Sequence, residues 1–188
     1  MVVASMRWHL VTSRNIVRDR WLTVRADHCR LPDGREIDPY YVLEYPDWVN
    51  IVALTTAEEI VLVRQYRHGL GDTGIELPAG IVEPNDATPE SAVRRELLEE
   101  TGYGFEVARL TGVLSANPAT HSNRTHCFLA TGCEKRSVPE LDATESLETL
   151  LVPVGELAAL TRTGAMVQSL HVASIFFALW ELDRIRAR

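Results

Sequence analysis

The hydrophobic and polar positions of the first fifty residues form short strand-like runs separated by turn residues. Runs at 21–26 and 40–45 lie on either side of a Leu-Pro-Asp-Gly-Arg sequence at 31–35, which is typical of a hairpin turn. The pattern predicts a small antiparallel sheet, rich in aromatic residues, within residues 8–50. Three strands alone are only marginally stable in water. We therefore expect this sheet to pack on the main domain or on another subunit.

The rest of the chain alternates between apolar runs of strand length and segments with helical spacing. Strands are predicted at residues 50–54, 59–64, 105–114, 125–130 and 148–152. Residues 115–124 and the acidic stretch 132–147 are predicted loops, and a short helix is expected at 154–160. An amphipathic helix is predicted over 168–188, with these side chains facing inward: Leu170, Ile175, Phe176, Leu179 and Leu182. This order predicts an α/β fold, but the periodicity alone leaves several α/β arrangements open.

One more helix is predicted from its end signals, directly after a Pro/Gly-rich loop that begins at Leu77. Thr88 can cap it, because its hydroxyl can accept a hydrogen bond from an otherwise unpaired backbone N–H. Pro89 suits the first helical position, where no donor is needed. Gly102 suits the left-handed residue that follows a helix. The helix should therefore span the residues between Thr88 and Gly102.

Three glutamates of this helix, Glu96, Glu99 and Glu100, should share one face, because residues three and four apart are neighbours on a helix. Glu96 and Glu100 repel each other at this spacing and weaken the helix by a few tenths of a kcal/mol unless a cation lies between them. A solvated acidic face with an Arg95–Glu99 ion pair would have the same spacing. The Pro/Gly loop favours a different interpretation, because it can bring backbone carbonyls to the carboxylates. Such an oxygen-only site suits a hard divalent cation such as Mg²⁺ or Mn²⁺.

Composition restricts the class of protein. The chain has 188 residues, 46% hydrophobic and 24% charged, as expected for a globular protein of one domain, or of one domain with an appended subdomain. Its net charge of −7 argues against broad nucleic-acid binding. Three cysteines without metal-ligand spacing favour reduced thiols in the cytoplasm. We expect no signal peptide and no membrane span, and translation can begin at Met1 or Met6.

The segment from Gly80 to Tyr103 resembles the Nudix box, Gly-x5-Glu-x7-Arg-Glu-U-x-Glu-Glu-x-Gly-U, where U is apolar or aromatic. Its second half, from Arg95 to Tyr103, matches at every fixed position. In the first half Asp86 stands where the family has Glu, and one extra residue precedes Arg95. We interpret this as an insertion in the turn before the helix. The resemblance implies an α/β/α sandwich around a mixed sheet, formed by residues 51–188, with residues 1–50 forming the small antiparallel sheet.

Beyond the box, the chain resembles the ADP-ribose and nucleoside-diphosphate-sugar pyrophosphatase branch. The resemblance rests on Val-Arg-Gln-Tyr-Arg at 63–67, Glu-Leu-Pro-Ala-Gly at 76–80 and the N-terminal sheet. It implies metal-dependent hydrolysis of a diphosphate linkage, giving a nucleoside monophosphate and a sugar phosphate. It also implies a homodimer in which the N-terminal sheet is exchanged. Asn123 stands where many ADP-ribose enzymes have an acidic residue. The preferred substrate could therefore be a nucleoside diphosphate sugar other than ADP-ribose.

The resemblance also implies roles for individual residues. The metal ligands would be the carbonyl of Ala79 and the carboxylates of Glu96, Glu99 and Glu100. Arg95 would orient these carboxylates, and Gly80 and Gly102 belong to the structural motif.

Arg67 matches an arginine of the family that contacts phosphate, and Arg124 is a candidate contact to phosphate or sugar. The general base is expected to be Glu145, in the loop before the last strand; Asp142 and Glu148 are less favoured neighbours. Glu99 is the competing base.

Two alternatives remain from the sequence. One is a Nudix hydrolase that acts on nucleoside triphosphates or dinucleoside polyphosphates. The other is a catalytically silent Nudix domain that senses a ligand or binds a partner.

Overall fold

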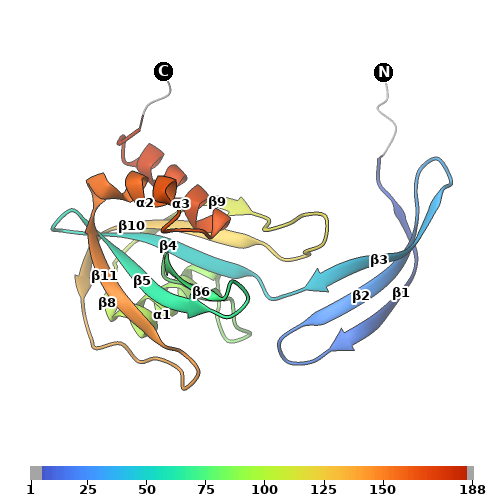
Figure 1. The fold of residues 1–188 in the computed structure, drawn as a ribbon, viewed down its shortest axis with the longest axis horizontal. Coiled ribbons are helices and arrows are strands. Elements are labelled where there is room, and N and C mark those ends of the chain that lie inside the picture. The colour runs from blue at the N-terminus through green and yellow to red at the C-terminus, as the bar shows by residue number, and fades with distance from the viewer. Residues whose placement is uncertain (1–5, 186–188) are drawn as a thin grey trace. The chain divides into compact units, whose positions relative to one another are not determined.

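The computed structural model describes residues 6–185, and the chain divides into two compact units (Figure 1). The first unit contains Met1–Pro46 and Ser115–Asn123, and the second contains Asp47–Leu114 and Arg124–Arg188. No helix in the described part of the chain is long and apolar enough to cross a membrane.

The first unit is a three-stranded antiparallel sheet. Its strands, β1 (His9–Arg18), β2 (Thr23–Arg30) and β3 (Glu36–Glu44), are hydrogen-bonded in the order β1-β2-β3. The predicted turn between the second and third strands is closed by a hydrogen bond from the Leu31 N–H to the Arg35 carbonyl, 2.8 Å long. The segment 115–123 joins this unit, because the Leu43 N–H donates to the Thr120 carbonyl over 2.7 Å.

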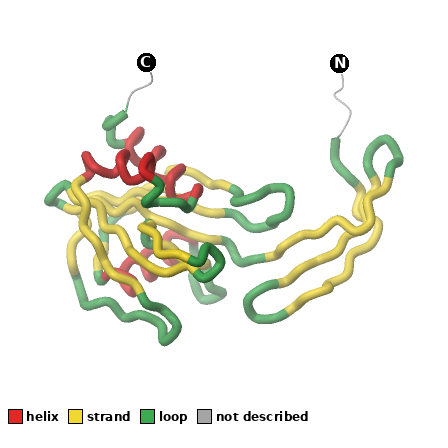
Figure 2. The backbone as a smooth tube through the Cα atoms, in the orientation of Figure 1, coloured by secondary structure: helices red, strands yellow, loops and turns green. Residues whose placement is uncertain are grey.

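The second unit is built around a mixed sheet of eight strands (Figure 2). The central order is β11-β5-β4-β10-β8, with β6 beside β5, β7 beside β4 and β9 beside β10. β4 and β10 run parallel, whereas the other paired strands are antiparallel. The strands are β4 (Trp48–Thr55), β5 (Glu59–Arg67), β6 (Asp72–Glu76), β7 (Ala79–Ile81), β8 (Tyr103–Gly104), β9 (Ala108–Leu114), β10 (Thr125–Lys135) and β11 (Leu147–Pro153).

Helices cover both faces of this sheet, as Figure 1 shows. The helical elements are α1 (Pro89–Thr101), η1 (Val154–Glu156), α2 (Leu157–Thr163) and α3 (Ser169–Glu181). Alternate residues of β4 belong to two separate cores. Ile51 packs with Leu97 of α1, and Val52 packs with Ile175 of α3. Because successive side chains of a strand point to opposite faces, this alternation confirms the predicted α/β/α sandwich.

The structure corrects several predicted boundaries. The strand expected at 105–114 begins at Ala108, because the Phe105 side chain turns into the core and is fully buried. The loop expected at 132–147 is shorter, because β10 continues to Lys135 and pairs there with β8. Residues 72–76, where the sequence analysis places no strand, form strand β6.

The terminal helix is also shorter than predicted, because α3 ends at Glu181 and Asp183 adopts a left-handed conformation with a φ of 58°. The last predicted positions, 186–188, lie outside the described residues. Phe176 was expected to face inward, but 51% of it is exposed. Leu170, Ile175 and Leu179 are buried as predicted.

Candidate active site

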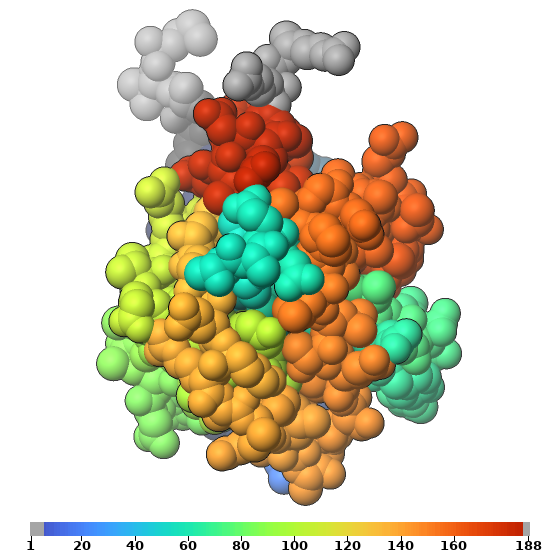
Figure 3. Space-filling model, turned by 90° about the vertical axis from the view of Figure 1, so that its left-hand side faces the viewer, coloured from blue at the N-terminus to red at the C-terminus, as the bar shows by residue number. Residues whose placement is uncertain are grey.

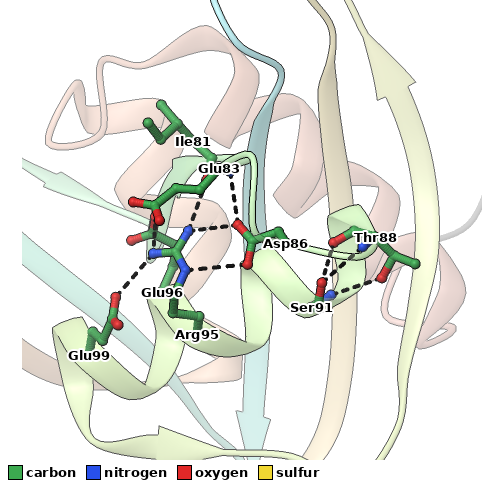
Figure 4. Close-up of polar contacts among 8 residues, drawn as sticks. All are labelled: Ile81, Glu83, Asp86, Thr88, Ser91, Arg95, Glu96 and Glu99. Carbon is green, nitrogen blue, oxygen red and sulfur yellow. Dashed lines mark hydrogen bonds and ion pairs between the residues drawn. The ribbon is translucent and has the colours of Figure 1, made fainter.

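The ends of α1 are fixed by local hydrogen bonds, as the sequence predicts. The Thr88 hydroxyl accepts from the Ser91 N–H over 3.1 Å, and the Ser91 hydroxyl accepts from the Thr88 N–H over 3.0 Å (Figure 4). Gly102 follows the helix in the left-handed region with a φ of 69°, and its N–H donates to the Leu98 carbonyl. These bonds fix both ends of α1, so that Glu96, Glu99 and Glu100 all lie within the helix.

Arg95 lies at the centre of the polar cluster in Figure 4. Its Nη1 donates to Glu96 over 2.9 Å and to Glu99 over 3.1 Å. Its Nη2 donates to Asp86 over 3.0 Å and to the Ile81 carbonyl over 3.1 Å. Arg95 thus links the loop before α1 to two glutamates of the helix.

Asp86 belongs to this cluster in spite of the extra residue in the turn. Besides Arg95, its carboxylate accepts from the Glu83 N–H over 2.9 Å. These contacts hold the pKa of Asp86 below its usual value, with the hydrogen bonds from Arg95 as the largest cause. The insertion therefore changes the length of the turn but keeps Asp86 paired with Arg95.

Gly80 lies against the carboxylate of Glu96. A Cβ atom at residue 80 would overlap the Glu96 carboxylate. The absence of a side chain lets the backbone of β7 approach the helix this closely.

Glu96 and Glu100 are buried, with 8% and 4% of their surfaces exposed. Burial raises the pKa of Glu96 to about 7, against the opposing effect of Arg95. Burial raises the pKa of Glu100 to about 8, and the Ala79 N–H, which donates to Glu100 over 3.1 Å, opposes this. The neighbouring charge of Glu145 also raises both pKa values. A divalent cation beside both carboxylates would favour their ionised forms.

The backbone of Ala79 faces these carboxylates. Pro78 accepts from the Ile51 N–H over 3.1 Å, so 51 and 78 form a hydrogen-bonded pair, and the neighbouring pair Asn50–Ala79 is a non-bonded one. The N–H and carbonyl of Ala79 therefore point away from β4, on the side where the N–H meets Glu100.

The donor set fits a hard divalent cation. The carboxylates of Glu96, Glu99 and Glu100 and the Ala79 carbonyl are all oxygen ligands, which Mg²⁺ and Mn²⁺ prefer. In the described part of the chain, no three His, Cys, Asp or Glu side chains already converge as a ligand group. Here Arg95 holds Glu96 and Glu99, and Ala79 holds Glu100.

Arg67 has a partner that the sequence interpretation did not identify. Its Nε and Nη2 donate to the two carboxylate oxygens of Glu76 over 2.8 and 2.6 Å. Burial disfavours the charged form of Glu76, but the Arg67 contacts outweigh it and lower the pKa of Glu76. His171 of α3 lies beside this pair, with its Nδ1 4.0 Å from a Glu76 oxygen. The only feature of the sequence that points to a role for His171 is its position among the mostly apolar residues of α3.

Glu145 lies in the loop between β10 and β11, which forms much of the lower surface in Figure 3. Its carboxylate accepts from the Asp142 N–H over 3.1 Å. Glu148, the neighbouring acid, pairs instead with Arg64.

Arg124 is exposed at the start of β10, and its N–H donates to Asp47 over 2.8 Å.

Comparisons with known proteins agree with this geometry. The family model described as the NUDIX domain matches residues 44–170. The model described as the nucleoside diphosphate sugar hydrolase N-terminal domain matches residues 8–43.

Two curated relatives match most of the chain. An ADP-ribose pyrophosphatase of Mycobacterium tuberculosis is 29% identical over 174 residues, which is 92% of this chain and 84% of the relative. An ADP-sugar pyrophosphatase of Mus musculus is 33% identical over 180 residues, which is 87% of this chain and 81% of the relative. A crystal structure of an ADP compounds hydrolase, 21% identical, shares the fold with a TM-score of 0.84 over 97% of this chain and 100% of that chain.

The box residues on α1, the sheet between two helical layers and the match of the NUDIX model to most of the chain agree. This chain belongs to the Nudix hydrolase family.

Proposed function

We propose that this protein hydrolyses the diphosphate linkage of ADP-ribose or another nucleoside diphosphate sugar, with Mg²⁺ or Mn²⁺ as cofactor. The products would be a nucleoside monophosphate and a sugar phosphate. The observation that carries the proposal is the pair of buried carboxylates, Glu96 and Glu100, with raised pKa values beside the backbone of Ala79. The names of the two curated relatives support this substrate class.

The metal-binding residues in this proposal are Ala79, through its carbonyl, and Glu96, Glu99 and Glu100, through their carboxylates. A bound divalent cation neutralises diphosphate oxygens and lowers the pKa of bound water. Arg95 would orient Glu96 and Glu99, and its hydrogen bonds to both carboxylates support this role.

Arg67 would bind a phosphate of the substrate. Arg67 donates to Glu76 through Nε and Nη2, and its Nη1 forms no hydrogen bond with any of the described residues. About half of the Arg67 side chain, 49%, is exposed. Glu76 thus fixes the direction of Arg67 while leaving part of the cation for an anionic ligand. Arg124, exposed at the start of β10, would be a second contact to phosphate or sugar.

Glu145 would serve as the general base. Its charge already influences Glu96, Glu100 and Arg67, because it contributes to the raised pKa of each. Its neighbours Asp142 and Glu148 are less suited, because Asp142 forms the turn with Glu145 and Glu148 pairs with Arg64. Glu99, the competing base, is held by Arg95.

We further propose that the enzyme is a cytoplasmic homodimer assembled through the first unit. Nine of the ten residues of β1 are exposed, which suits a strand that another copy covers. The three cysteines are free and buried, in keeping with a reducing compartment.

A substrate panel tests the proposal. Release of nucleoside monophosphate from ADP-ribose, GDP-mannose and UDP-glucose should be measured with Mg²⁺ or Mn²⁺, beside ATP and a dinucleoside polyphosphate. Hydrolysis of at least one nucleoside diphosphate sugar or ADP-ribose in preference to ATP is expected. Turnover of ATP alone would overturn the substrate assignment, and no turnover of any compound would favour a silent domain.

A further inference from the structure

A buried imidazole of the terminal helix contacts the loop that carries Ala79. His171 lies in the first turn of α3, and only 5% of its surface is exposed. Its Nδ1 accepts a hydrogen bond from the Leu77 N–H over 3.2 Å. The two residues are 94 positions apart in sequence, so this contact ties the helical layer behind the sheet to the candidate active site.

This contact completes the restraint of the segment Leu77–Ala79. The Leu77 N–H is held by His171, the Pro78 carbonyl by Ile51, and the Ala79 N–H by Glu100. Each of three successive residues therefore has one backbone group fixed by a different element. Loss of the Leu77 bond would remove the first of these three restraints and leave the Ala79 carbonyl less precisely directed.

The same imidazole also borders the ion pair of Glu76 and Arg67. Its Nδ1 lies 4.0 Å from Glu76, whose side chain is 4% exposed. Both side chains are buried and lie beside each other, so loss of the imidazole would remove a neighbour that limits the movement of the Glu76 carboxylate. The His171 side chain thus supports both the Ala79 carbonyl, a proposed metal ligand, and Arg67, the proposed phosphate-binding residue.

The protonation state of His171 suits this contact. Burial lowers the pKa of His171 to about 4, so the ring is neutral near pH 7 and Nδ1 is free to accept. The helix is held in place independently, because the Ser174 hydroxyl, in the next turn, donates to Asn50 over 2.6 Å.

We infer that His171 is a positioning residue of the hydrolase, which fixes the Ala79 carbonyl through the Leu77 N–H and the direction of Arg67 through Glu76. The inference rests on the proposed function, since it assigns to His171 the support of groups that would bind metal and phosphate. It predicts that an acceptor at the position of Nδ1, rather than an imidazole as such, is what the site requires.

Two substitutions separate positioning from packing. His171→Asn keeps an acceptor oxygen near the position of Nδ1, whereas His171→Leu keeps an apolar side chain of similar bulk without an acceptor. Ile175→Val serves as the control, because it weakens the packing of α3 in the core that Ile175 shares with Leu77 but leaves the hydrogen bond from the Leu77 N–H to His171 intact. All three proteins would be studied at a temperature at which each is folded.

The first two measurements need no turnover. Hydrogen exchange of the Leu77 amide should remain slow in the wild type, in His171→Asn and in Ile175→Val, and should accelerate in His171→Leu. Affinity for Mn²⁺ alone, from the electron paramagnetic resonance signal of the free ion, should fall at least about tenfold in His171→Leu, since residues that support metal ligands typically contribute this much. His171→Asn should stay within about threefold of the wild type.

The third measurement is steady-state hydrolysis of a substrate that the wild type accepts. His171→Leu should lower kcat and also raise the KM for substrate, because both the carbonyl and Arg67 are displaced, and His171→Asn should restore most of both. Equal losses in His171→Asn and His171→Leu, or a comparable loss in Ile175→Val, would overturn the inference. Wild-type Mn²⁺ affinity and kinetics in His171→Leu would do the same. An inactive wild type would instead refute the proposed function, and amide exchange and Mn²⁺ affinity would still test His171.

Discussion

At the scale of single residues, Glu96 and Glu100 depend most strongly on their surroundings. They are two acids on one helix face, both nearly inaccessible to water, and of the two only Glu96 is in contact with Arg95. Burial of an unpaired carboxylate disfavours its charged form. A divalent cation bound beside these carboxylates would favour their ionised forms. Two predictions follow from this, one for pH and one for turnover.

The first prediction concerns pH. Both folded pKa values, about 7 and about 8, lie above the ordinary value of 4.5. The unfolded chain therefore releases these protons at lower pH than the folded chain, so the metal-free protein should lose stability as pH rises from about 5 to about 8. The loss should be on the order of a few kcal/mol. Mg²⁺ should raise the melting temperature more at pH 8 than at pH 5.5, because binding needs the ionised carboxylates.

Thermal melts at several pH values, with and without MgCl₂, test this directly. The double variant Glu96→Gln/Glu100→Gln should show neither the pH dependence nor the effect of Mg²⁺. An effect of Mg²⁺ that is the same at both pH values would contradict the assignment of these residues as ligands.

The second prediction concerns turnover. Glu99→Gln and Glu100→Gln should each lower kcat by about a hundredfold or more, as removal of a group that stabilises the transition state does. The fold should persist, because a Gln at position 100 can still accept from the Ala79 N–H. The matched control is Glu90→Gln, an exposed glutamate in the first turn of the same helix that pairs with Arg94. Full activity in excess EDTA would exclude a metal-dependent reaction.

At the scale of elements, α1 and the loop after β10 form one connected structure. Near the end of α1, the Glu99 carbonyl accepts from the Glu140 N–H over 2.8 Å. The Gly102 carbonyl accepts from the N–H groups of Arg136 and Ser137, and Lys135 Nζ donates to the Thr101 carbonyl. The first half of the loop is therefore anchored to α1, whereas Glu145 lies in the exposed second half. Such an arrangement suits a segment that closes over a substrate from a fixed base.

The third prediction tests the base in this loop. Glu145→Gln should lower kcat by about a hundredfold or more, because it removes a general base, with little change in KM. Glu140→Gln is the control, since it keeps the backbone contact to Glu99 and changes an exposed side chain of the same loop. If Glu145→Gln stays within a few-fold of the wild-type kcat while Glu99→Gln abolishes turnover, the base lies in the box.

At the scale of the whole molecule, the first unit is a small sheet whose outer strand is almost entirely exposed. Its exposed apolar side chains include Trp8, Leu10, Ile16 and Val17. A three-stranded sheet with such a surface gains stability when another copy covers it, and closed twofold symmetry is the commonest form of such assembly.

The fourth prediction is the oligomeric state. Light scattering at micromolar concentration should give a mass near twice the 21.0 kDa of one chain. Ile16→Glu should shift the protein toward the monomer, since it places a charge on β1, whereas Val107→Glu, at an exposed site of the second unit, should not. A fully active wild-type monomer would show that the sheet has no such role.

Much of the site follows from the sequence alone, because its signals are local. Thr88, Pro89 and Gly102 define α1 through bonds within a few residues, and helical spacing then places Glu96, Glu99 and Glu100 on one face. The apolar runs also predict most of the strands of the main sheet, but periodicity alone leaves several α/β arrangements open, and the α/β/α sandwich is implied by the resemblance to the Nudix family.

Tertiary structure alone decided the contacts that join distant segments. Glycines at 69, 71 and 74 interrupt the strand pattern, so the sequence does not predict β6. It therefore does not show that Glu76 lies beside Arg67. Nothing near His171 indicates that it accepts from Leu77. Phe176 has the helical spacing of an inward residue, yet it lies beyond the edge of the buried face. Periodicity determines which residues share a face, but strand register and helix docking determine what that face meets, and these depend on the packing of the whole chain.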